Sequence, residues 1–390
     1  MKPARGITLI EVMVSLVVSA FISIVVVGVM SMVETSKRRT ISGSDLGQVA
    51  AYVQAVLDRA LRNAGSGFTQ AAAHAFGCQL HAARSGTQVL PRTSANPLPA
   101  PFASVNTGTT GVFRLAPVVI ANGQTTPGIS GQPSDVLIVM SGQSGQSETA
   151  MSFAADAQLG TLLLQNSVGL APNDLLLVTD RQPISSGMAP CLFEQVASSF
   201  NPATAGGTVA LTGTYAANSV DTAVLTDYSI VSQVLNLGNV ANGNPPSLQL
   251  VGVGDDNTLY SYDLLQTSGA PLQPMGDGVF ELQALYGLDT NGDRRIDQWA
   301  APTGDYAVAS LMDGSAAANT RLRTIVAVRI GLLLRTLMQE GSAVAPASLR
   351  LFTELGDDLT YTRTLSTAEQ RYRYRTLEST VPLRNLLLTP

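Results

Sequence analysis

The chain begins with a short basic segment, followed by an apolar run that ends at Val33. From Ile7 to Val33 this run holds one ionisable residue, Glu11. About 25 apolar residues in a helix, each rising about 1.5 Å, are enough to cross a bilayer. A carboxylate inside such a segment costs roughly 2.5–3.5 kcal/mol on insertion scales, which marks Glu11 as a functional residue. We therefore predict a membrane-spanning helix over residues 7–33.

Apolar positions at helical spacing continue after this run. Between residues 35 and 64 they recur three or four positions apart, at Leu46, Val49, Val53, Val56, Leu57 and Ala60. The segment RNAGSGF, residues 62–68, then brings in two glycines, as the C-termini of helices often do. The pattern predicts one long helix whose second half, residues 34–66, lies outside the membrane.

Beyond residue 67 the pattern changes to short β-like runs separated by turn residues. Seven prolines lie between Pro91 and Pro133, which predicts a loop-rich stretch there. Short strands are predicted at residues 136–140, 161–164, 174–178, 208–211, 225–231 and 248–251. The strongest strand signals are at 324–336 and at 371–383, where alternating Tyr and Arg predict one covered and one solvent-exposed face.

The start of the apolar run resembles the class III signal of type IV pilins and pseudopilins. The resemblance lies in Gly6 before a hydrophobic residue, in the sequence ITLIEV, and in Glu11 four positions after Ile7. It implies that a prepilin peptidase cleaves after Gly6 and N-methylates Ile7, while the apolar helix stays on the mature protein. A plain signal anchor is the alternative, but it leaves Glu11 and the Gly6–Ile7 junction unexplained. Lys2 and Arg5 place the N-terminus in the cytoplasm and the rest outside.

The same resemblance suggests what Glu11 does. In a fibre, its carboxylate can pair with the free amine that cleavage creates on Ile7 of a neighbouring subunit. A charge pair in a low dielectric is worth forming only when the register is right. We therefore expect Glu11 to align subunits during assembly.

Composition and charge limit the other classes of function. A formal net charge of −5 and a pI near 5.1 argue against a strongly cationic nucleic-acid binder. No lysine follows residue 37, so the exported part has no lysine for a phosphate-binding loop or a Schiff base. Arg321, Arg323, Arg329 and Arg335 can form a patch for DNA, but Arg329 and Arg335 lie in strand phase and suit a sheet equally well.

Candidate catalytic groups are few. The two histidines, His74 and His81, lie in an Ala- and Gly-rich region, and no Gly-x-Ser-x-Gly motif surrounds a nucleophile. Asp255, Asp256 and Asp263 can be paired, yet scattered surface acids are the commoner explanation. We predict that the protein is not an enzyme.

Two cysteines, Cys78 and Cys191, fall in the part predicted to be exported, where thiols are usually oxidised. An even count there favours one disulfide, and closing a loop of over 100 residues adds up to about 4–5 kcal/mol in the chain-entropy model. The alternative is a metal site that also uses His74 and His81, although that spacing matches no zinc pattern.

An acidic segment, GLDTNGDRRIDQW at residues 287–299, has the spacing of a calcium loop. Its candidate ligands at positions 1, 3, 5, 7 and 9 are Asp289, Asn291, Asp293, the Arg295 carbonyl and Asp297. Two departures weaken the match, because the glycine expected at position 6 and the glutamate expected at position 12 are absent. The alternative is a turn in which the same side chains bond their own backbone.

Several segments together resemble the PilW group of minor pilins, which is related to the J-type minor pseudopilin of type II secretion. They are the N-terminal segment, RNAG at 62–65, the two separated cysteines, GLDTNGD, and VPLRN at 381–385. The resemblance implies a membrane-anchored subunit with no required cofactor beyond the calcium candidate. It would act with other minor pilins, the major pilin and the inner-membrane assembly platform. This complex would prime pilus assembly and remain at or near the tip, with roles in twitching motility and adhesion and with a tip adhesin as a candidate partner.

We predict an α+β, pilin-like fold in which a long N-terminal helix packs on an antiparallel β-sheet with long loop insertions. The predicted parts are a cleaved leader (1–6), a transmembrane and polymerisation segment (7–33), the periplasmic half of the helix (34–66) and a β-rich globular domain (67–390). The chain would be a single-pass inner-membrane protein that later enters the pilus. A minor pseudopilin of a type II secretion system is the alternative, because it shares leader, anchor and fold.

Overall fold

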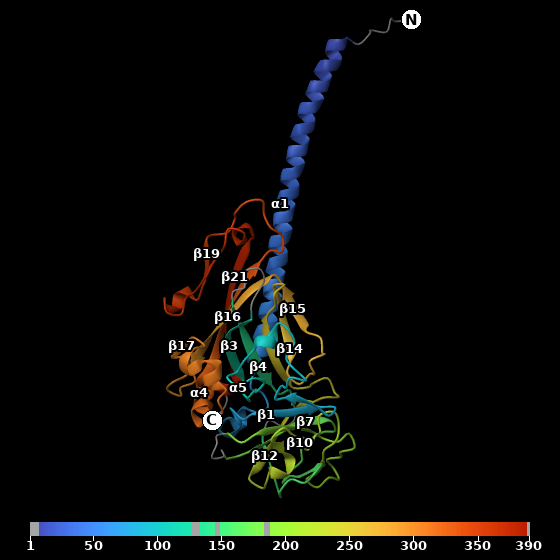
Figure 1. The fold of residues 1–390 in the computed structure, drawn as a ribbon, viewed down its shortest axis with the longest axis vertical. Coiled ribbons are helices and arrows are strands. Elements are labelled where there is room, and N and C mark those ends of the chain that lie inside the picture. Colours follow the sequence, from blue (N-terminus) through green and yellow to red (C-terminus); the bar gives the residue numbers. More distant parts are fainter. Residues whose placement is uncertain (1–7, 126–132, 145–148, 183–187, 388–390) are drawn as a thin grey trace, which may run out of the picture.

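The protein consists of a long helical stalk attached to a β-rich body (Figure 1). The structure is a computed structural model that describes residues 8–125, 133–144, 149–182 and 188–387. Helix α1, Leu9–Asn63, forms the stalk with its first half and enters the body with its second half.

The sequence of α1 explains why only its second half is covered. Every described side chain from Leu9 to Val33 is exposed. Farther along, residues three or four positions apart are buried against the body: Leu46, Ala50, Val53, Leu57 and Leu61. The predicted long helix is confirmed, and it ends at Asn63.

A four-stranded antiparallel sheet packs against α1. Its order is β17-β16-β18-β21, with bounds Gln298–Ala300, Val279–Leu288, Ile325–Arg335 and Tyr374–Pro382. Successive side chains of β18 alternate between two cores, because Leu332 and Leu334 join the core that contains α1 while Leu333 joins another. This sheet is therefore covered on both faces.

A five-stranded antiparallel sheet completes the contact with α1. Its order is β15-β14-β13-β4-β3, with bounds Gln273–Asp277, Thr258–Asp263, Ser247–Val253, Ser134–Ser141 and Val118–Thr125. At Gly276 the strand β15 comes so close to α1 that an added Cβ would lie 2.5 Å from a methyl of Val53. Only glycine permits this approach.

A third sheet lies at the end of the body farthest from the N-terminus, in the green region of Figure 1. Its order is β2-β1-β8-β7-β12-β5, with bounds Thr87–Leu90, Leu80–Arg84, Cys191–Gln195, Asp174–Asp180, Ser232–Asn239 and Met151–Ser152. Two small antiparallel pairs join it: β6 (Thr161–Leu163) with β9 (Thr208–Ala210), and β10 (Ser219–Val220) with β11 (Ala223–Val224). The segment from β5 to β12, here called the distal module, supplies most of a separate hydrophobic core.

The far face of the four-stranded sheet is covered by a hairpin of β19 (Ser348–Leu351) and β20 (Tyr361–Thr364). At Gly331 an added Cβ would lie 2.7 Å from the ring of Phe352, so the hairpin packs here because the sheet has no side chain in the way. The remaining short helices are α2 (Ala72–Ala75), α3 (Val308–Leu311), α4 (Ala316–Thr324) and α5 (Arg384–Leu387).

The observed fold confirms the predicted α+β class with a long helix on antiparallel sheets. Strands β4, β6, β7, β9, β13, β18 and β21 fall where strands were predicted. The prediction at 225–231 is wrong, because residues 225–227 form a 3-10 turn and β12 begins at Ser232. The proline-rich stretch predicted as loop contains β3. The domain boundaries at 1–6, 7–33, 34–66 and 67–390 stay predictions.

Candidate functional site

The N-terminus of α1 is capped by the residue pair Thr8 and Glu11. The Thr8 hydroxyl accepts a hydrogen bond from the Glu11 amide at 3.3 Å, and one Glu11 carboxylate oxygen accepts bonds from the Thr8 amide and hydroxyl, both at 2.9 Å. This reciprocal arrangement is a capping box, and the sequence signals it as Thr-x-x-Glu. The sequence analysis missed Thr8, while Gly6 and Ile7, the predicted cleavage and methylation residues, lie outside the described residues.

The apolar half of α1 is long enough to cross a membrane. The segment Leu9–Val33 has a mean hydropathy of 2.8 and none of it is buried in the body. Its 25 residues span roughly 37 Å at about 1.5 Å each. Apolar surface of this extent requires a partner, either lipid or the helices of other subunits.

Two segments that carried the family resemblance meet at the other end of α1. The side chain of Asn385, in VPLRN, donates hydrogen bonds to the carbonyls of Asn63 at 3.1 Å and Ala64 at 3.0 Å, both in RNAG. Both carbonyls lie at the C-terminus of α1, where the helix offers them no amide of its own, and the Asn63 carbonyl also accepts from the Ser66 amide at 3.1 Å. Gly65 then turns the chain with φ +82° and donates from its amide to the carbonyl of Met140 at 2.9 Å. The C-terminal segment therefore fixes the place where α1 joins the body.

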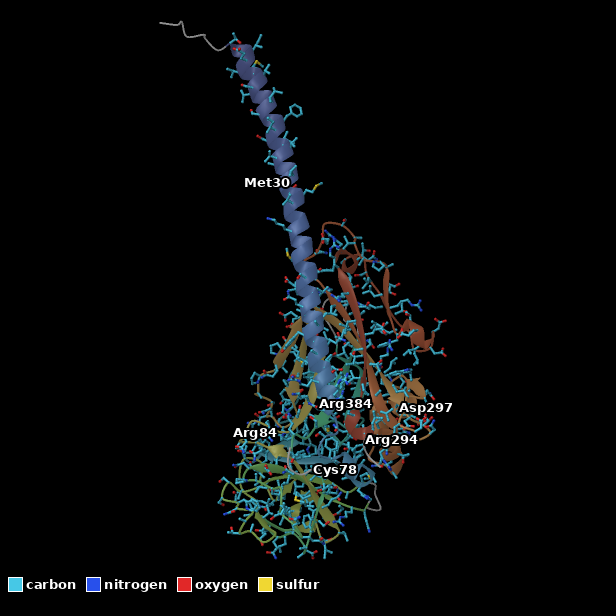
Figure 2. All side chains as sticks on the ribbon, turned by 180° about the vertical axis from the view of Figure 1, so that it is seen from behind. Met30, Cys78, Arg84, Arg294, Asp297 and Arg384 are labelled. Carbon is cyan, nitrogen blue, oxygen red and sulfur yellow. A yellow bond between two sulfur atoms is a disulfide. The ribbon has the colours of Figure 1, made fainter. Side chains whose placement is uncertain are left out.

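The acidic segment forms a closed turn between β16 and β17, and Figure 2 shows Arg294 and Asp297 on it. Asp297 accepts bonds from the amides and side chains of Thr290 and Asn291. Asp289 accepts from the amides of Gly292 and Arg294, and the side-chain oxygens of Asn291 and Asp293 each accept from the amide two residues on. The hydrogen bonds from Thr290 hold the pKa of Asp297 below its ordinary value.

This geometry supports the turn and leaves the calcium hypothesis without support. The side-chain oxygens proposed as ligands at Asp289, Asn291, Asp293 and Asp297 already accept hydrogen bonds from the loop itself. Among the described residues, no group of three or more His, Cys, Asp or Glu side chains is placed to hold a metal ion. The interpretation of this segment as a calcium loop is therefore corrected.

Cys78 and Cys191 form a disulfide, as predicted, across 113 residues of chain. It joins the start of β1 to the start of β8, next to the point where these two strands pair in parallel. The zinc alternative is wrong, because both sulfurs are in this bond. His81 is buried with its Nδ1 atom 3.1 Å from the Val220 carbonyl, and burial lowers its pKa.

Three of the four arginines considered for DNA binding make contacts within the body, while the fourth, Arg323, is exposed. Arg321 pairs with Asp305 at 2.8 Å, and Arg329 pairs with Glu354 and Glu378. Arg335 is 6% exposed and stacks over the rings of Phe280 and Tyr372, with its guanidinium carbon 5.0 and 4.5 Å from the ring centroids. Arg329 and Arg335 share one face of β18, as the strand phase predicts.

Two of the acids considered for catalysis, Asp256 and Asp263, make hydrogen bonds within the body. Asp256 accepts from the hydroxyl of Tyr260 at 2.6 Å, and Asp263 accepts from the amide of Leu265 at 2.9 Å. These bonds shape the ends of β14 and bring no second acid or nucleophile to the carboxylates.

A buried ionic cluster, which the sequence analysis missed, holds the β19–β20 hairpin on the sheet. Glu281 on β16 is fully buried and lies 3.4 Å from Arg363 on β20, which also pairs with Glu369 at 2.6 Å. Burial raises the pKa of Glu281 to about 7, although Arg363 opposes the shift. No local sequence pattern signals this cluster, because its members come from three separate segments.

Two family models match the chain. The model for the Type IV Pilus-assembly protein W, PilW, matches residues 238–385, and the model for the prokaryotic N-terminal methylation motif matches residues 1–30. No curated protein and no solved structure matches the chain. The first match covers β15, β18 and β21, three of the strands that pack against α1, and the segment that caps its end; the second covers the capped apolar start of α1. The two matches therefore support the predicted resemblance to the PilW group of type IV pilus minor pilins, and the second places the prokaryotic N-terminal methylation motif at the start of the chain.

Proposed function

We propose that this protein is a minor pilin that joins other minor pilins in a membrane-anchored complex, primes type IV pilus assembly, and stays at or near the tip of the fibre. The observation that carries the proposal is the fully exposed apolar half of α1 with Glu11 in its first turn. A structural role fits the PilW family, and it requires no catalytic group or cofactor in the body.

The methylation-motif match supports a defined processing route. A prepilin peptidase cleaves between Gly6 and Ile7 and methylates the new amine on Ile7. Before assembly, Leu9–Val33 spans the inner membrane with the body on the periplasmic side, as the positive-inside bias of Lys2 and Arg5 favours. The assembly platform then moves the subunit from the membrane into the growing fibre, where a tip position would serve motility and adhesion.

Glu11 would guide this transfer. In the single chain one of its oxygens is held by Thr8. In the fibre, the carboxylate would bind the amine of Ile7 in a neighbouring subunit. An unpaired charge in an apolar setting is costly, so a misaligned neighbour is rejected.

Substituting Glu11→Ala tests this role. We expect normal cleavage of the leader, because the peptidase acts before assembly, and a strong loss of the protein from sheared pili. Ser15→Ala, in the same apolar segment, is the matched control and should leave incorporation unchanged. Normal recovery of the Glu11→Ala protein in sheared pili would contradict the assembly role of Glu11.

A deletion strain separates the pilus role from type II secretion. Surface pili are counted by electron microscopy while secreted enzymes are assayed in the same culture. Loss of pili with secretion intact is the expected outcome. Normal pili with failed secretion would assign the chain to the minor pseudopilins of a secretion system.

A further inference from the structure

The loop between β18 and β19, residues 336–347, is here called the proximal loop. It rises from the end of the body nearest the apolar half of α1, and Figure 1 shows it arching beside that helix. Figure 2 labels Met30, near the end of the apolar segment, and the proximal loop reaches along α1 toward that level. The loop therefore stands where the body faces the membrane that α1 is proposed to span.

The proximal loop is held in a defined shape. Arg371 donates from Nε to the Glu340 carbonyl at 3.0 Å and from Nη2 to the Gly341 carbonyl at 3.1 Å. Arg373 binds the Glu340 carboxylate at 2.9 Å, and its carbonyl accepts from the Thr336 amide, also at 2.9 Å. The loop is thus anchored at several points.

The braced loop nevertheless presents large apolar side chains to solvent. Leu337 is 72% exposed, Met338 is 59% exposed and Val344 is 40% exposed. Exposing several large apolar side chains to water is unfavourable, so their grouping on a fixed loop indicates contact with an apolar or interfacial partner.

The charge around the loop is opposite to that of the whole chain. Residues 37, 43–47, 336–347 and 371–375, whose side chains the structure describes, together contain four basic residues and two acidic ones, while the chain has a formal net charge of −5. Lys37 and Arg375 are exposed. A basic surface with protruding Leu and Met side chains suits the headgroup region of an anionic bilayer, which attracts the charges and accepts the apolar groups.

We propose that the proximal loop docks on the anionic phospholipid surface of the membrane that α1 spans, with Leu337 and Met338 inserted into the interface. The inference rests on the proposed function in one respect, namely that Leu9–Val33 is a membrane anchor. Docking fixes the tilt of the body on the membrane before assembly, and it must be released when the subunit enters the fibre. Because the spanning helix tethers the loop next to the bilayer, the effective concentration of lipid at the loop is high. Even a weak affinity of the loop for the lipid surface is then enough for docking.

The test places a fluorophore on the loop of the full chain. No described cysteine is free, so Met338→Cys gives one labelling site, and Val168→Cys, which is 76% exposed on the distal module, gives the matched control. Each protein is reconstituted in vesicles of phosphatidylcholine, with or without phosphatidylglycerol, containing a lipid with a nitroxide in its headgroup region. We expect quenching at position 338 to exceed that at 168 several-fold, to rise with phosphatidylglycerol and to fall at high salt.

The first label replaces Met338, which is itself proposed to insert into the interface, so a second label is placed at a position that leaves Met338 in place. Ser342→Cys is labelled in the exposed part of the same loop, in the native background and together with Leu337→Ser and Met338→Ser. The two serines should lower lipid quenching at 342 several-fold while circular dichroism stays unchanged, because both native side chains are exposed.

Each outcome decides between stated alternatives. Equal quenching at 338 and 168, in protein that floats with the vesicles, overturns the docking proposal and leaves the anchor intact. A label at 338 that is shielded from water but not quenched by lipid overturns it in favour of contact with another protein subunit. Protein that does not float with vesicles overturns the anchor, and with it the proposed function.

Discussion

The junction between α1 and the body can be tested at a single side chain, Asn385. Its amide donates to two carbonyls at the C-terminus of α1, that of Asn63, an exposed residue, and that of Ala64, a fully buried residue. In Asn385→Ala, water can replace the bond to Asn63 but replaces the bond to Ala64 only in part. One net hydrogen bond contributes about 1 kcal/mol, so we expect that loss of stability.

Asn385→Asp keeps the shape of the side chain but turns its donor into an acceptor. The carboxylate would face two carbonyl oxygens at the negative end of the helix dipole, which adds roughly 0.3–1 kcal/mol to the loss. We therefore expect Asp to be worse than Ala, at about 2 kcal/mol in total. Steric substitution effects alone would give the opposite order.

Thermal melts of the full chain in mild detergent measure this order. The melting temperature should fall by about 1–2 °C per kcal/mol, because the entropy of unfolding of a body of over 300 residues is large. Exposed Asn242, changed to Ala and to Asp, controls for composition and charge. If the two Asn385 variants melt within error of the Asn242 variants, the amide does not hold the end of α1 and the reasoning fails.

Three further predictions concern the body. Replacing Cys78 and Cys191 by Ala should cost about 5 kcal/mol, because the disulfide closes a loop of 113 residues, and reduction of the native protein should lower its melting temperature to that of the variant. Glu281 has a folded-state pKa raised from 4.5 to about 7, so its contribution to stability is fully present below pH 4.5 and is lost as the pH rises through 7. Glu281→Gln should therefore flatten the decline in stability between these pH values by up to about 3 kcal/mol in denaturant titrations at pH 5 and pH 8, and an unchanged slope would refute the assignment. Asp297→Ala should speed hydrogen exchange at the amides of Thr290 and Asn291, and calorimetric titration of the native protein with calcium should give no heat; heat of binding at millimolar calcium would restore the calcium loop.

Helix α1 could be predicted because its buried residues recur at helical spacing along the sequence. Strand β21 lies where a strand was predicted, but its burial does not alternate as the Tyr and Arg pattern predicts, because only Val381 along it is buried. Strand β4 is fully buried and was predicted because its apolar run is uninterrupted. Strands β12 and β16 are also fully buried but were missed, because buried polar residues such as Asn236, Glu281 and Gln283 interrupt their apolar runs. The segment 225–231 was predicted as strand because Leu225, Tyr228, Ile230 and Val231 make it rich in apolar residues, while its first three residues form a 3-10 turn in which Leu225 is buried.

The site residues divide in a similar way. Glu11 and the two cysteines are recognisable from residue type and position alone. Thr8 is recognisable too, since a threonine three residues before a glutamate at a helix start signals a capping box. The pairing of Asn385 with the end of α1 joins residues 321 positions apart, and the cluster of Glu281, Arg363 and Glu369 joins three segments, so neither has a local signal.

The residues covered by the PilW match separate the part of the body that packs against α1 from the distal module. Residues 238–385 contain the whole four-stranded sheet, strands β13, β14 and β15, and the segment that caps α1. Of the elements that contact α1, β15, β18 and β21 lie inside the match, while β4 lies outside it. The distal module lies almost wholly outside the match and has a separate hydrophobic core, and the disulfide ties its strand β8 to β1. Strands β7, β8 and β12 of the module also place Leu177, Phe193 and Leu235 in the core that contains α1. A change confined to the separate core therefore leaves the packing of α1 largely unaffected, so the end of the body farthest from the N-terminus can vary in surface while the helix keeps its place.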